Sequence, residues 1–331
     1  MHRSRPKAIF FGSAEFSLPT LRKLHAADSI DLIGVVTQPV KPRGRGLQPT
    51  PTPVQHFAEK VGLTVWAPAR VRDPQLLAQI QHLRPDFMVV VAYGQILPPA
   101  LLAIPPYGIL NVHASLLPAY RGPAPIQRAL LNGEDRTGVT IMRIDEGVDT
   151  GDILAKEEVP IRPEDTAQTL HDTLAERGAE LLLRILPDYL AGRLTPQKQD
   201  PQQASYAPKI TREDSWIDWG QPAQRIWYQI RALNPWPGAV ARLPTSKRPI
   251  LKIWQGRPAQ PEELPPEAAS ARPGTILQVG PQGILVACGE GALWIERLQQ
   301  EGGRVLGWKE FVAGHPMQPG MVLRPGKPEE A

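Results

Sequence analysis

Three polar residues stand at positions that suit acyl-transfer chemistry: Asn111, His113 and Asp149. Asn111 and His113 are two residues apart at the end of a predicted strand, so their side chains point to one face of a sheet. Asp149 follows in the run Val148–Asp152. An amide donor, an imidazole and a carboxylate can together stabilise an oxyanion and transfer a proton. The same types and spacing also fit a structural histidine and an aspartate in an ordinary turn.

A longer stretch around these residues carries a family resemblance. It consists of Asn111–Pro118, Arg121–Gln127 and Gly138–Met142, and it continues to Asp152. This string resembles the signature of the formyltransferases that use 10-formyl-tetrahydrofolate, in particular those whose acceptor is a methionyl-tRNA. The resemblance implies that the formyl group of 10-formyl-tetrahydrofolate, a cosubstrate, moves to the α-amino group of methionine on initiator tRNA, for translation initiation.

That reaction gives each of the three polar residues an expected role. We expect His113 to act as general acid and base, because an imidazole has both charge states near neutrality. We expect Asn111 to donate its amide hydrogens to the developing oxyanion, a contribution of about 3 kcal/mol for comparable donors. We expect Asp149 to orient His113 and to help relay the proton through water.

The resemblance also implies where the folate binds. The expected folate-binding residues are Ser115, Leu116, Leu117, Pro118, Val91, Tyr93 and Gly94. Backbone groups of the loop would pair with the pterin edge, while leucine side chains cover its flat face. For Val89–Val91 the alternative is a plain core strand. Phe16 is a candidate wall of the methionine pocket, although its loop reads Gly-Ser-Ala where the family more often has Gly-Thr-Pro.

Two basic segments indicate how a tRNA acceptor would be held. The segment Gln38–Gly46 carries Lys41, Arg43 and Arg45 between prolines and glycines, which predicts a loop that can reach phosphates and terminal bases. Lys209 lies in Tyr206–Ile210, which resembles the linker of the tRNA enzymes.

Two other functions remain open from the residues. A formyltransferase that acts on an amino-sugar nucleotide would share both domains. A non-catalytic nucleic-acid-binding homologue would use a small barrel to stack bases, with Trp254, Trp294 and Trp308 as candidate platforms, although buried tryptophans are the alternative. A formyl-transfer assay discriminates between these functions.

Composition excludes several other classes. The net charge is +4 and the computed isoelectric point is about 9.2, so the overall positive charge is small for a protein that binds nucleic acid.

The motifs of two cofactor classes are missing from the sequence. No G-x-G-x-x-G follows the first predicted strand, and no cluster has metal-ligand spacing, so we expect neither a nicotinamide cofactor nor a metal. The single cysteine, Cys288, is expected to be a buried hydrophobe. We expect a cytoplasmic monomer with no membrane span or signal peptide.

The elements that position these residues follow from the hydrophobic pattern. Apolar runs at Ala8–Phe11, Asp31–Thr37, Phe87–Tyr93 and Gly108–His113 alternate with helical stretches. This alternation predicts a doubly wound, Rossmann-like α/β sheet, in which ligands bind at the carboxyl ends of the strands. A long helical pattern spans Asp165–Leu190, and Pro187 is expected to end or kink it.

The rest of the chain changes character. One amphipathic helix, Ala223–Leu233, precedes short β segments separated by proline and glycine. Short strands with turn signals predict a small β-barrel, and the resemblance implies an OB-like one. We therefore expect a catalytic formyltransferase domain over 1–191, a linker over 192–209 and an OB-like, tRNA-binding domain over 210–331.

Overall fold

The structure is a computed structural model that describes residues 5–43, 48–243 and 249–325. The chain divides into two compact units. The first comprises 1–125, 136–160 and 171–207, and the second comprises 126–135, 161–170 and 208–331. The segment expected to be a linker therefore belongs to the first unit as far as residue 207. The predicted division into domains stays a prediction.

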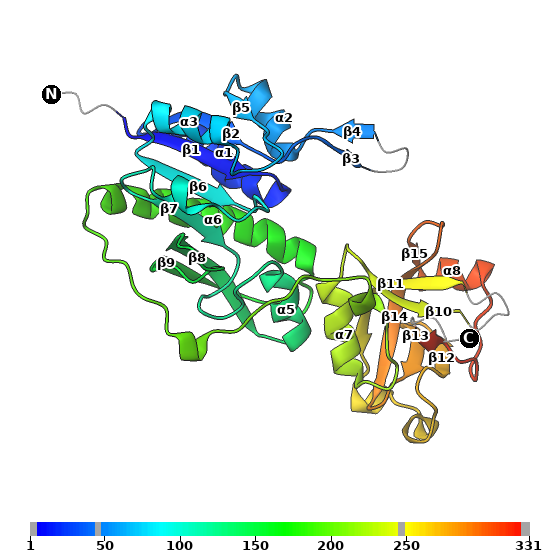
Figure 1. The fold of residues 1–331 in the computed structure, drawn as a ribbon. Coiled ribbons are helices and arrows are strands. Elements are labelled where there is room, and N and C mark those ends of the chain that lie inside the picture. The colour runs from blue at the N-terminus through cyan, green and yellow to red at the C-terminus, as the bar shows by residue number, and fades with distance from the viewer. Residues whose placement is uncertain (1–4, 44–47, 244–248, 326–331) are drawn as a thin grey trace. The chain divides into compact units, whose positions relative to one another are not determined.

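The first unit is built on a seven-stranded sheet, counted within the described residues (Figure 1). Its order is β5-β2-β1-β6-β7-β8-β9. The strands are β1 (Lys7–Gly12), β2 (Asp31–Val36), β5 (Val65–Trp66), β6 (Phe87–Val91), β7 (Ile109–His113), β8 (Arg136–Arg143) and β9 (Ile153–Pro160). The strands from β5 to β7 run parallel, whereas β8 is antiparallel to both of its neighbours. The parallel part confirms the doubly wound interpretation.

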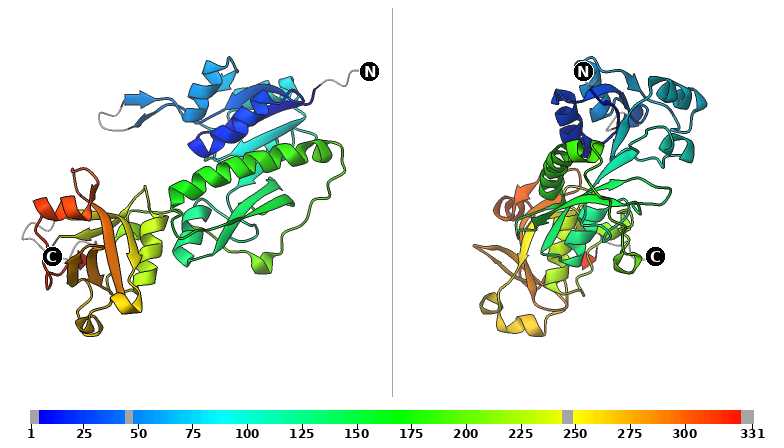
Figure 2. Two further views of the ribbon diagram at one scale, coloured as in Figure 1. Left: turned by 180° about the vertical axis from the view of Figure 1, so that it is seen from behind. Right: turned by 90° about the vertical axis from the view of Figure 1, so that its left-hand side faces the viewer.

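Helices cover both faces of this sheet. The helices as far as residue 190 are η1 (Glu15–Ser17), α1 (Leu18–Ala26), α2 (Pro53–Lys60), α3 (Pro74–Leu83), α4 (Pro99–Leu102), α5 (Pro125–Asn132) and α6 (Ala167–Leu190). Of these, residues 126–132 of α5 and 167–170 of α6 belong to the second unit. Leu76 of α3 and Leu101 of α4 are buried in one cluster with Ile109 of β7. On the other face α6 runs along the sheet, as Figures 1 and 2 show. There Gly178 approaches β7 so closely that an added Cβ would lie 2.4 Å from a methyl carbon of Val112.

The alternation of side chains along β7 decides where the candidate catalytic residues point. Val112 lies against α6, so Asn111 and His113 belong to the opposite face, together with Ile109. His113 is the last residue of β7. It therefore stands at the carboxyl end of a parallel strand, where doubly wound folds bind their ligands.

Of the two expected effects of Pro187 on α6, an end or a kink, the end does not occur, because the helix continues to Leu190, where the predicted helical pattern also ends. Proline removes one backbone hydrogen bond from a helix. The following turn is nevertheless held: the Ala191 N–H donates to the Pro187 carbonyl, and the buried Tyr189 donates its hydroxyl to the carbonyl of Tyr107. Tertiary packing of this last turn outweighs the missing bond.

The expectation of an irregular loop at Gln38–Gly46 also needs correction. β3 (Lys41–Arg43) and β4 (Gln48–Thr50) form an antiparallel pair in which Arg43 is opposite Gln48. Figure 1 shows this two-stranded ribbon extending from the first unit. Pro42 is opposite Pro49 in the pair. Proline has no N–H to donate, and both strands of a two-stranded ribbon are edge strands, where such a donor is not needed. Arg45 lies outside the described residues.

The second unit is an antiparallel sheet with α7 (Ala223–Ala232) and α8 (Trp308–Gly314). Its strands are β10 (Ala239–Arg242), β11 (Ile250–Pro258), β12 (Ile276–Gly280), β13 (Gly283–Ala287), β14 (Ala292–Gln300), β15 (Leu306–Gly307) and β16 (Arg324–Pro325). The order is β12-β13-β14-β11-β10-β16, and β15 pairs with β14. In the described part of the chain no strand pairing closes this sheet into the expected barrel. The segments at its two ends are linked by an isolated bridge between Thr275 and Val322 and by neighbouring backbone bonds, such as that from the Leu323 N–H to the Gly274 carbonyl.

Candidate active site

His113 is held between two partners at the end of β7. Its side chain is almost fully buried, with the residue 6 % exposed. The Nε2 atom lies 2.9 Å from the carbonyl oxygen of Tyr120, and the Nδ1 atom lies 3.6 Å from Oδ2 of Asp149. A carbonyl oxygen can only accept, so Nε2 carries the hydrogen in this bond. Nδ1 therefore faces the carboxylate, and a second proton there would complete an ion pair.

Asn111 lies on the same face of β7 as His113. Its backbone is in register with Val90 of β6 and Met142 of β8, so the residue sits in the middle of the sheet. The residue is half-buried. The structure thus places an amide and an imidazole two residues apart on one face of β7, as the sequence predicted.

Asp149 reaches this place from the loop between β8 and β9. Its carboxylate accepts a hydrogen bond from the Gly122 N–H at 2.8 Å and lies beside the imidazole. Its backbone is left-handed, with φ of 53°, a conformation that few residues other than glycine adopt. Asp145 supports the loop, because its carboxylate accepts the Gly147 N–H and the Thr150 hydroxyl.

The turn after β7 is fixed by internal bonds. The Leu117 N–H donates to Oγ1 of Thr140, and the Leu117 carbonyl accepts from the Lys156 ammonium. The Ser115 hydroxyl donates to the carbonyl of Ala119. The Leu117 side chain is fully buried against Met142 and Ile153. Of the predicted folate residues in this turn, Leu116 and Pro118 are the half-buried ones.

The predicted folate residues after β6 divide in the same way. Val91 is fully buried, and Tyr93 is 2 % exposed and makes an edge contact with Phe11. Burial raises the pKa of the Tyr93 hydroxyl to about 12, so it stays protonated. Gly94 is exposed, with φ of 85°. Val91 and Tyr93 are thus core residues, whereas Gly94 is exposed at the strand end.

The residues expected to hold the acceptor lie in several places. Phe16 is 7 % exposed, and its ring meets the His171 ring edge-on at 5.2 Å between centroids. Lys41 and Arg43 belong to β3. Lys209 is exposed in the second unit, where its carbonyl accepts from Arg128. None of these positions tests the proposed contacts, which stay predictions.

The sequence interpretation missed the residues that support the site. Tyr120 supplies the carbonyl for His113, and Thr140 and Lys156 hold the turn. Gln199 also belongs to this group, since it donates to the carbonyls of Asp149 and Gly151. These are ordinary polar residues in the sequence, and only their three-dimensional neighbours give them a role.

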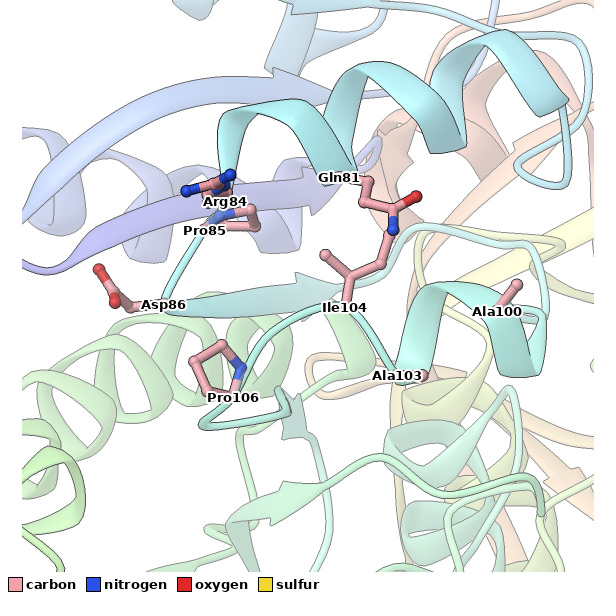
Figure 3. A pocket seen from close by; sticks show the side chains of 8 residues that line it. All are labelled: Gln81, Arg84, Pro85, Asp86, Ala100, Ala103, Ile104 and Pro106. Carbon is pink, nitrogen blue, oxygen red and sulfur yellow. The ribbon is translucent and has the colours of Figure 1, made fainter.

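A separate hollow lies at the opposite edge of the sheet (Figure 3). It is lined by Gln81, Arg84, Pro85, Asp86, Ala100, Ala103, Ile104 and Pro106. Asp86 and Pro106 precede β6 and β7, so the hollow is at the amino ends of these strands, away from His113. Its one carboxylate, that of Asp86, accepts the Lys7 N–H at 2.6 Å.

In the part of the chain that the structure describes, no group of three or more His, Cys, Asp or Glu side chains is arranged to hold a metal ion. No helix there combines the length and the apolar character needed to cross a bilayer.

Comparison with known families gives the class of protein. The formyl transferase family matches residues 7–186, which is more than half of the chain. The formyl transferase C-terminal domain matches residues 209–316. The two matches together cover both the part of the chain that carries Asn111, His113 and Asp149 and the part that forms the antiparallel sheet.

Curated relatives narrow this class. Methionyl-tRNA formyltransferase of Citrifermentans bemidjiense is 46 % identical over 317 residues, with 96 % of each chain covered. The enzyme of the same name from Trichlorobacter lovleyi is 44 % identical over 319 residues, with 96 % of this chain and 97 % of the relative covered. The chain therefore belongs to the formyl transferase family, among its methionyl-tRNA formyltransferases.

Solved structures support the fold at lower identity. HypX from Aquifex aeolicus, in complex with tetrahydrofolic acid, is 18 % identical with a TM-score of 0.60, covering 93 % of this chain and 47 % of HypX. An N-formyltransferase from Helicobacter canadensis, in complex with folinic acid and dTDP-3-aminofucose, is 19 % identical with a TM-score of 0.62, covering 89 % of this chain and 99 % of that enzyme. At these identities the likeness concerns the fold.

Proposed function

We propose that this chain transfers the formyl group of 10-formyl-tetrahydrofolate to the α-amino group of methionyl initiator tRNA. The observation that carries the proposal is the full-length similarity to methionyl-tRNA formyltransferases, at 46 % identity, in a chain that keeps Asn111, His113 and Asp149. Because the acceptor takes part in translation initiation, the proposed place of action is the cytoplasm. The proposed working unit is a monomer.

The geometry around His113 supports a proton-transfer role in this reaction. The neutral amine attacks the formyl carbon, a C–N bond forms, and the carbonyl oxygen becomes an oxyanion to which Asn111 donates. His113 keeps its Nε2 hydrogen on the Tyr120 carbonyl and takes the proton of the amine on Nδ1, through water. The Asp149 carboxylate, 3.6 Å from Nδ1, stabilises the resulting cation. The proton then passes to the folate nitrogen as its bond to the formyl carbon breaks.

Some of the residues at the carboxyl ends of β6 and β7 are accessible enough to contact a flat folate ring. Leu116 and Pro118 are half-buried and Gly94 is exposed, so these three offer surface beside His113. Leu117 has both of its backbone groups and its side chain engaged inside the protein. The proposed folate contacts are therefore those of Leu116, Pro118 and Gly94, with Leu117 shaping the turn that carries them.

The proposed acceptor contacts come from Lys41, Arg43, Arg45 and Lys209. Arginine and lysine side chains hold phosphates, and arginine in addition contacts base edges. The alternative acceptor is an amino-sugar nucleotide, as in the Helicobacter canadensis enzyme, whose structure contains dTDP-3-aminofucose. The high identity to the tRNA enzymes over 96 % of the chain favours the tRNA.

A direct acceptor comparison tests the proposal. The protein is incubated with labelled 10-formyl-tetrahydrofolate and, separately, methionyl-tRNA, a UDP-amino-sugar or glycinamide ribonucleotide. We expect label to appear on methionyl-tRNA alone. Label on the amino sugar alone would support the alternative enzyme, and label on none would leave a nucleic-acid-binding homologue without catalysis.

A further inference from the structure

Five residues of the first unit form a circuit beside His113, in which hydrogen bonds and the peptide bond between Arg121 and Gly122 close the ring. Nε2 of Gln199 donates to the carbonyl of Asp149 at 2.9 Å and to that of Gly151 at 2.7 Å. Oε1 of Gln199 accepts from Nε of Arg121 at 3.0 Å and from its Nη2 at 2.8 Å. The Asp149 carboxylate then accepts the N–H of Gly122, the neighbour of Arg121, at 2.8 Å.

The side-chain amide of Gln199 is fully used by this circuit. An amide has two N–H donors and an oxygen with two lone pairs, and all four have partners. The residue is half-buried, so water competes less for these bonds than it would at an exposed position. Neither a carboxylate nor an ammonium of similar length offers both donors and acceptors at one place.

The circuit joins the two loops that supply the partners of His113. Tyr120, which precedes Arg121, gives the carbonyl for Nε2, and Asp149 gives the carboxylate beside Nδ1. Both residues have left-handed backbones, with φ of 60° and 53°. Such conformations are unfavourable for residues other than glycine and persist only where neighbouring contacts enforce them.

The segment after Gln199 continues the same contact. The Arg121 N–H donates to the carbonyl of Ser205, and the Arg121 carbonyl accepts from Ala207. The Ser205 hydroxyl accepts the Tyr120 N–H at 2.9 Å. Residues 199–207 thus lie along the loop that contains Tyr120 and Arg121, and the Gln199 side chain also reaches the Asp149 loop.

We propose that Gln199 is a positioning residue for formyl transfer, which fixes the Asp149 carboxylate and the Tyr120 carbonyl on the two sides of the His113 imidazole. This inference rests on the proposed function. The Gln199 side chain bonds to Arg121, Asp149 and Gly151, so its proposed effect on the reaction passes through Asp149 and Arg121. Its loss should therefore lower the rate of chemistry and leave substrate affinity largely intact.

The test compares Gln199→Leu with the control Gln197→Leu in the full chain. Gln197 has the same side chain two residues earlier, but it is exposed and joins the sheet through its backbone bonds to Ile153. We expect kcat of Gln199→Leu to fall about 10- to 100-fold, because small displacements of catalytic groups have effects of this size. The KM values for methionyl-tRNA and formyl-tetrahydrofolate should change less than about threefold, and Gln197→Leu should behave like the wild type.

A double-mutant cycle separates positioning from a loss of stability. Asp149→Asn by itself should slow transfer by about 100-fold or more. If Gln199 acts through the Asp149 carboxylate, adding Gln199→Leu to Asp149→Asn should lower kcat by less than about twofold further. The variant Gln199→Glu keeps an acceptor for Arg121 but faces two carbonyls without a donor, so it should lose as much kcat as Gln199→Leu.

The outcomes distinguish this inference from the proposed function. A wild-type protein that formylates no methionyl-tRNA would refute the proposed function before Gln199 is considered. An active wild type with unchanged kcat in Gln199→Leu would refute the positioning role alone. Fully multiplicative losses in the double variant, or a raised KM with unchanged kcat, would also refute it.

Discussion

At the residue scale, the two partners of the His113 imidazole determine what it can do. The Tyr120 carbonyl holds the hydrogen on Nε2, and the Asp149 carboxylate faces Nδ1 at 3.6 Å. This arrangement resembles the general pattern of an imidazole oriented on one side and charge-stabilised on the other. Asn111, on the same strand face, completes a set that can accept a proton and donate to an oxyanion.

We expect His113→Ala and Asn111→Ala each to abolish most turnover while the fold stays intact. His113→Ala removes the proton acceptor, and Asn111→Ala removes a donor whose loss costs about 3 kcal/mol in comparable sites. Single-turnover rates of formyl transfer measure the effect, and thermal melting curves control for unfolding. A near-normal rate in either variant with a native melting curve would remove that residue from the catalytic assignment.

A second residue-scale prediction concerns Cys288. The residue is 6 % exposed in the core of the second unit, which confirms the sequence prediction of a buried hydrophobe. Burial raises the pKa of its thiol to about 12, so the thiolate is scarce at neutral pH. We expect the native protein to resist a thiol reagent such as Ellman's reagent at pH 8 and to react once per chain in denaturant. Rapid labelling of the native protein would contradict this burial.

At the element scale, α5 is tied to the start of the second unit's main segment by Arg128. Its guanidinium lies 3.1 Å from Oδ1 of Asp214 and donates to the carbonyls of Pro208 and Lys209. The Thr211 N–H and hydroxyl both donate to Oδ2 of Asp214. Burial opposes ionisation of Asp214, but the bonds from Thr211 and the charge of Arg128 outweigh it and hold its pKa below the ordinary value.

A carboxyl with a lowered pKa in the folded state has a defined effect on stability. It stabilises the fold at pH values above its unfolded pKa, and this stabilisation is lost as the pH falls through the folded pKa. We therefore expect Asp214→Asn to lower the free energy of unfolding at pH 7 by about 1 kcal/mol. The difference between variant and wild type should shrink as the pH falls below about 4, where the unfolded aspartate is protonated.

Urea unfolding at several pH values measures this difference. Asp188→Asn is the matched control, because Asp188 pairs with Arg193 at an exposed position and should change stability little at any pH. A constant difference between Asp214→Asn and the wild type from pH 7 to pH 3 would show that ionisation of Asp214 does not contribute.

The sequence predicted those elements whose hydrophobic pattern and structure agree. The apolar run Phe87–Tyr93 became β6, and the amphipathic Ala223–Leu233 became α7. The same reasoning failed where a contact distant in the sequence decides the outcome. Antiparallel pairing makes β3 out of Lys41–Arg43 despite its proline.

The candidate site was predictable to a similar extent. Asn111, His113 and Asp149 stand in a string with a recognisable order of residue types, so the sequence could single them out. Tyr120 and Gln199 act through a backbone carbonyl and through bonds to other backbones. Their side-chain types carry no such signal, and the partners with which they support the site lie from 7 residues away, for Tyr120 and His113, to 78 residues away, for Gln199 and Arg121. Only the fold brings them together.

At the scale of the whole molecule, the chain combines a modest net charge of +4 with an uneven distribution of its basic residues. Lys41, Arg43 and Arg45 lie within five residues of the sequence, and Lys41 and Arg43 belong to β3 of the ribbon that extends from the first unit (Figure 1). A nucleic acid responds to such local charge more than to the total, because each neutralised phosphate releases counterions. We therefore propose that the ribbon contacts the tRNA acceptor and does not contact the folate donor.

We expect the double replacement Arg43→Ala and Arg45→Ala to weaken binding of methionyl-tRNA and to leave binding of formyl-tetrahydrofolate unchanged. Loss of two phosphate contacts should reduce the slope of log K against log salt by about 1 to 2. KM for methionyl-tRNA should rise, most strongly at low salt where these contacts contribute most. Formylation across a salt titration, with folate affinity measured separately, gives both quantities.

The matched control for this prediction is Arg70→Ala with Arg72→Ala. Arg70 and Arg72 are two residues apart, like Arg43 and Arg45, and they are exposed in the first unit. Their replacement by alanine removes the same total charge as the ribbon variant. If the salt slope depends on contacts at the ribbon, the control should keep the wild-type slope. Equal slopes for both double variants would mean that only overall charge matters. An unchanged slope and rate in the ribbon variant would mean that its arginines are a solvated charge cluster, and the amino-sugar nucleotide would become the better-supported acceptor.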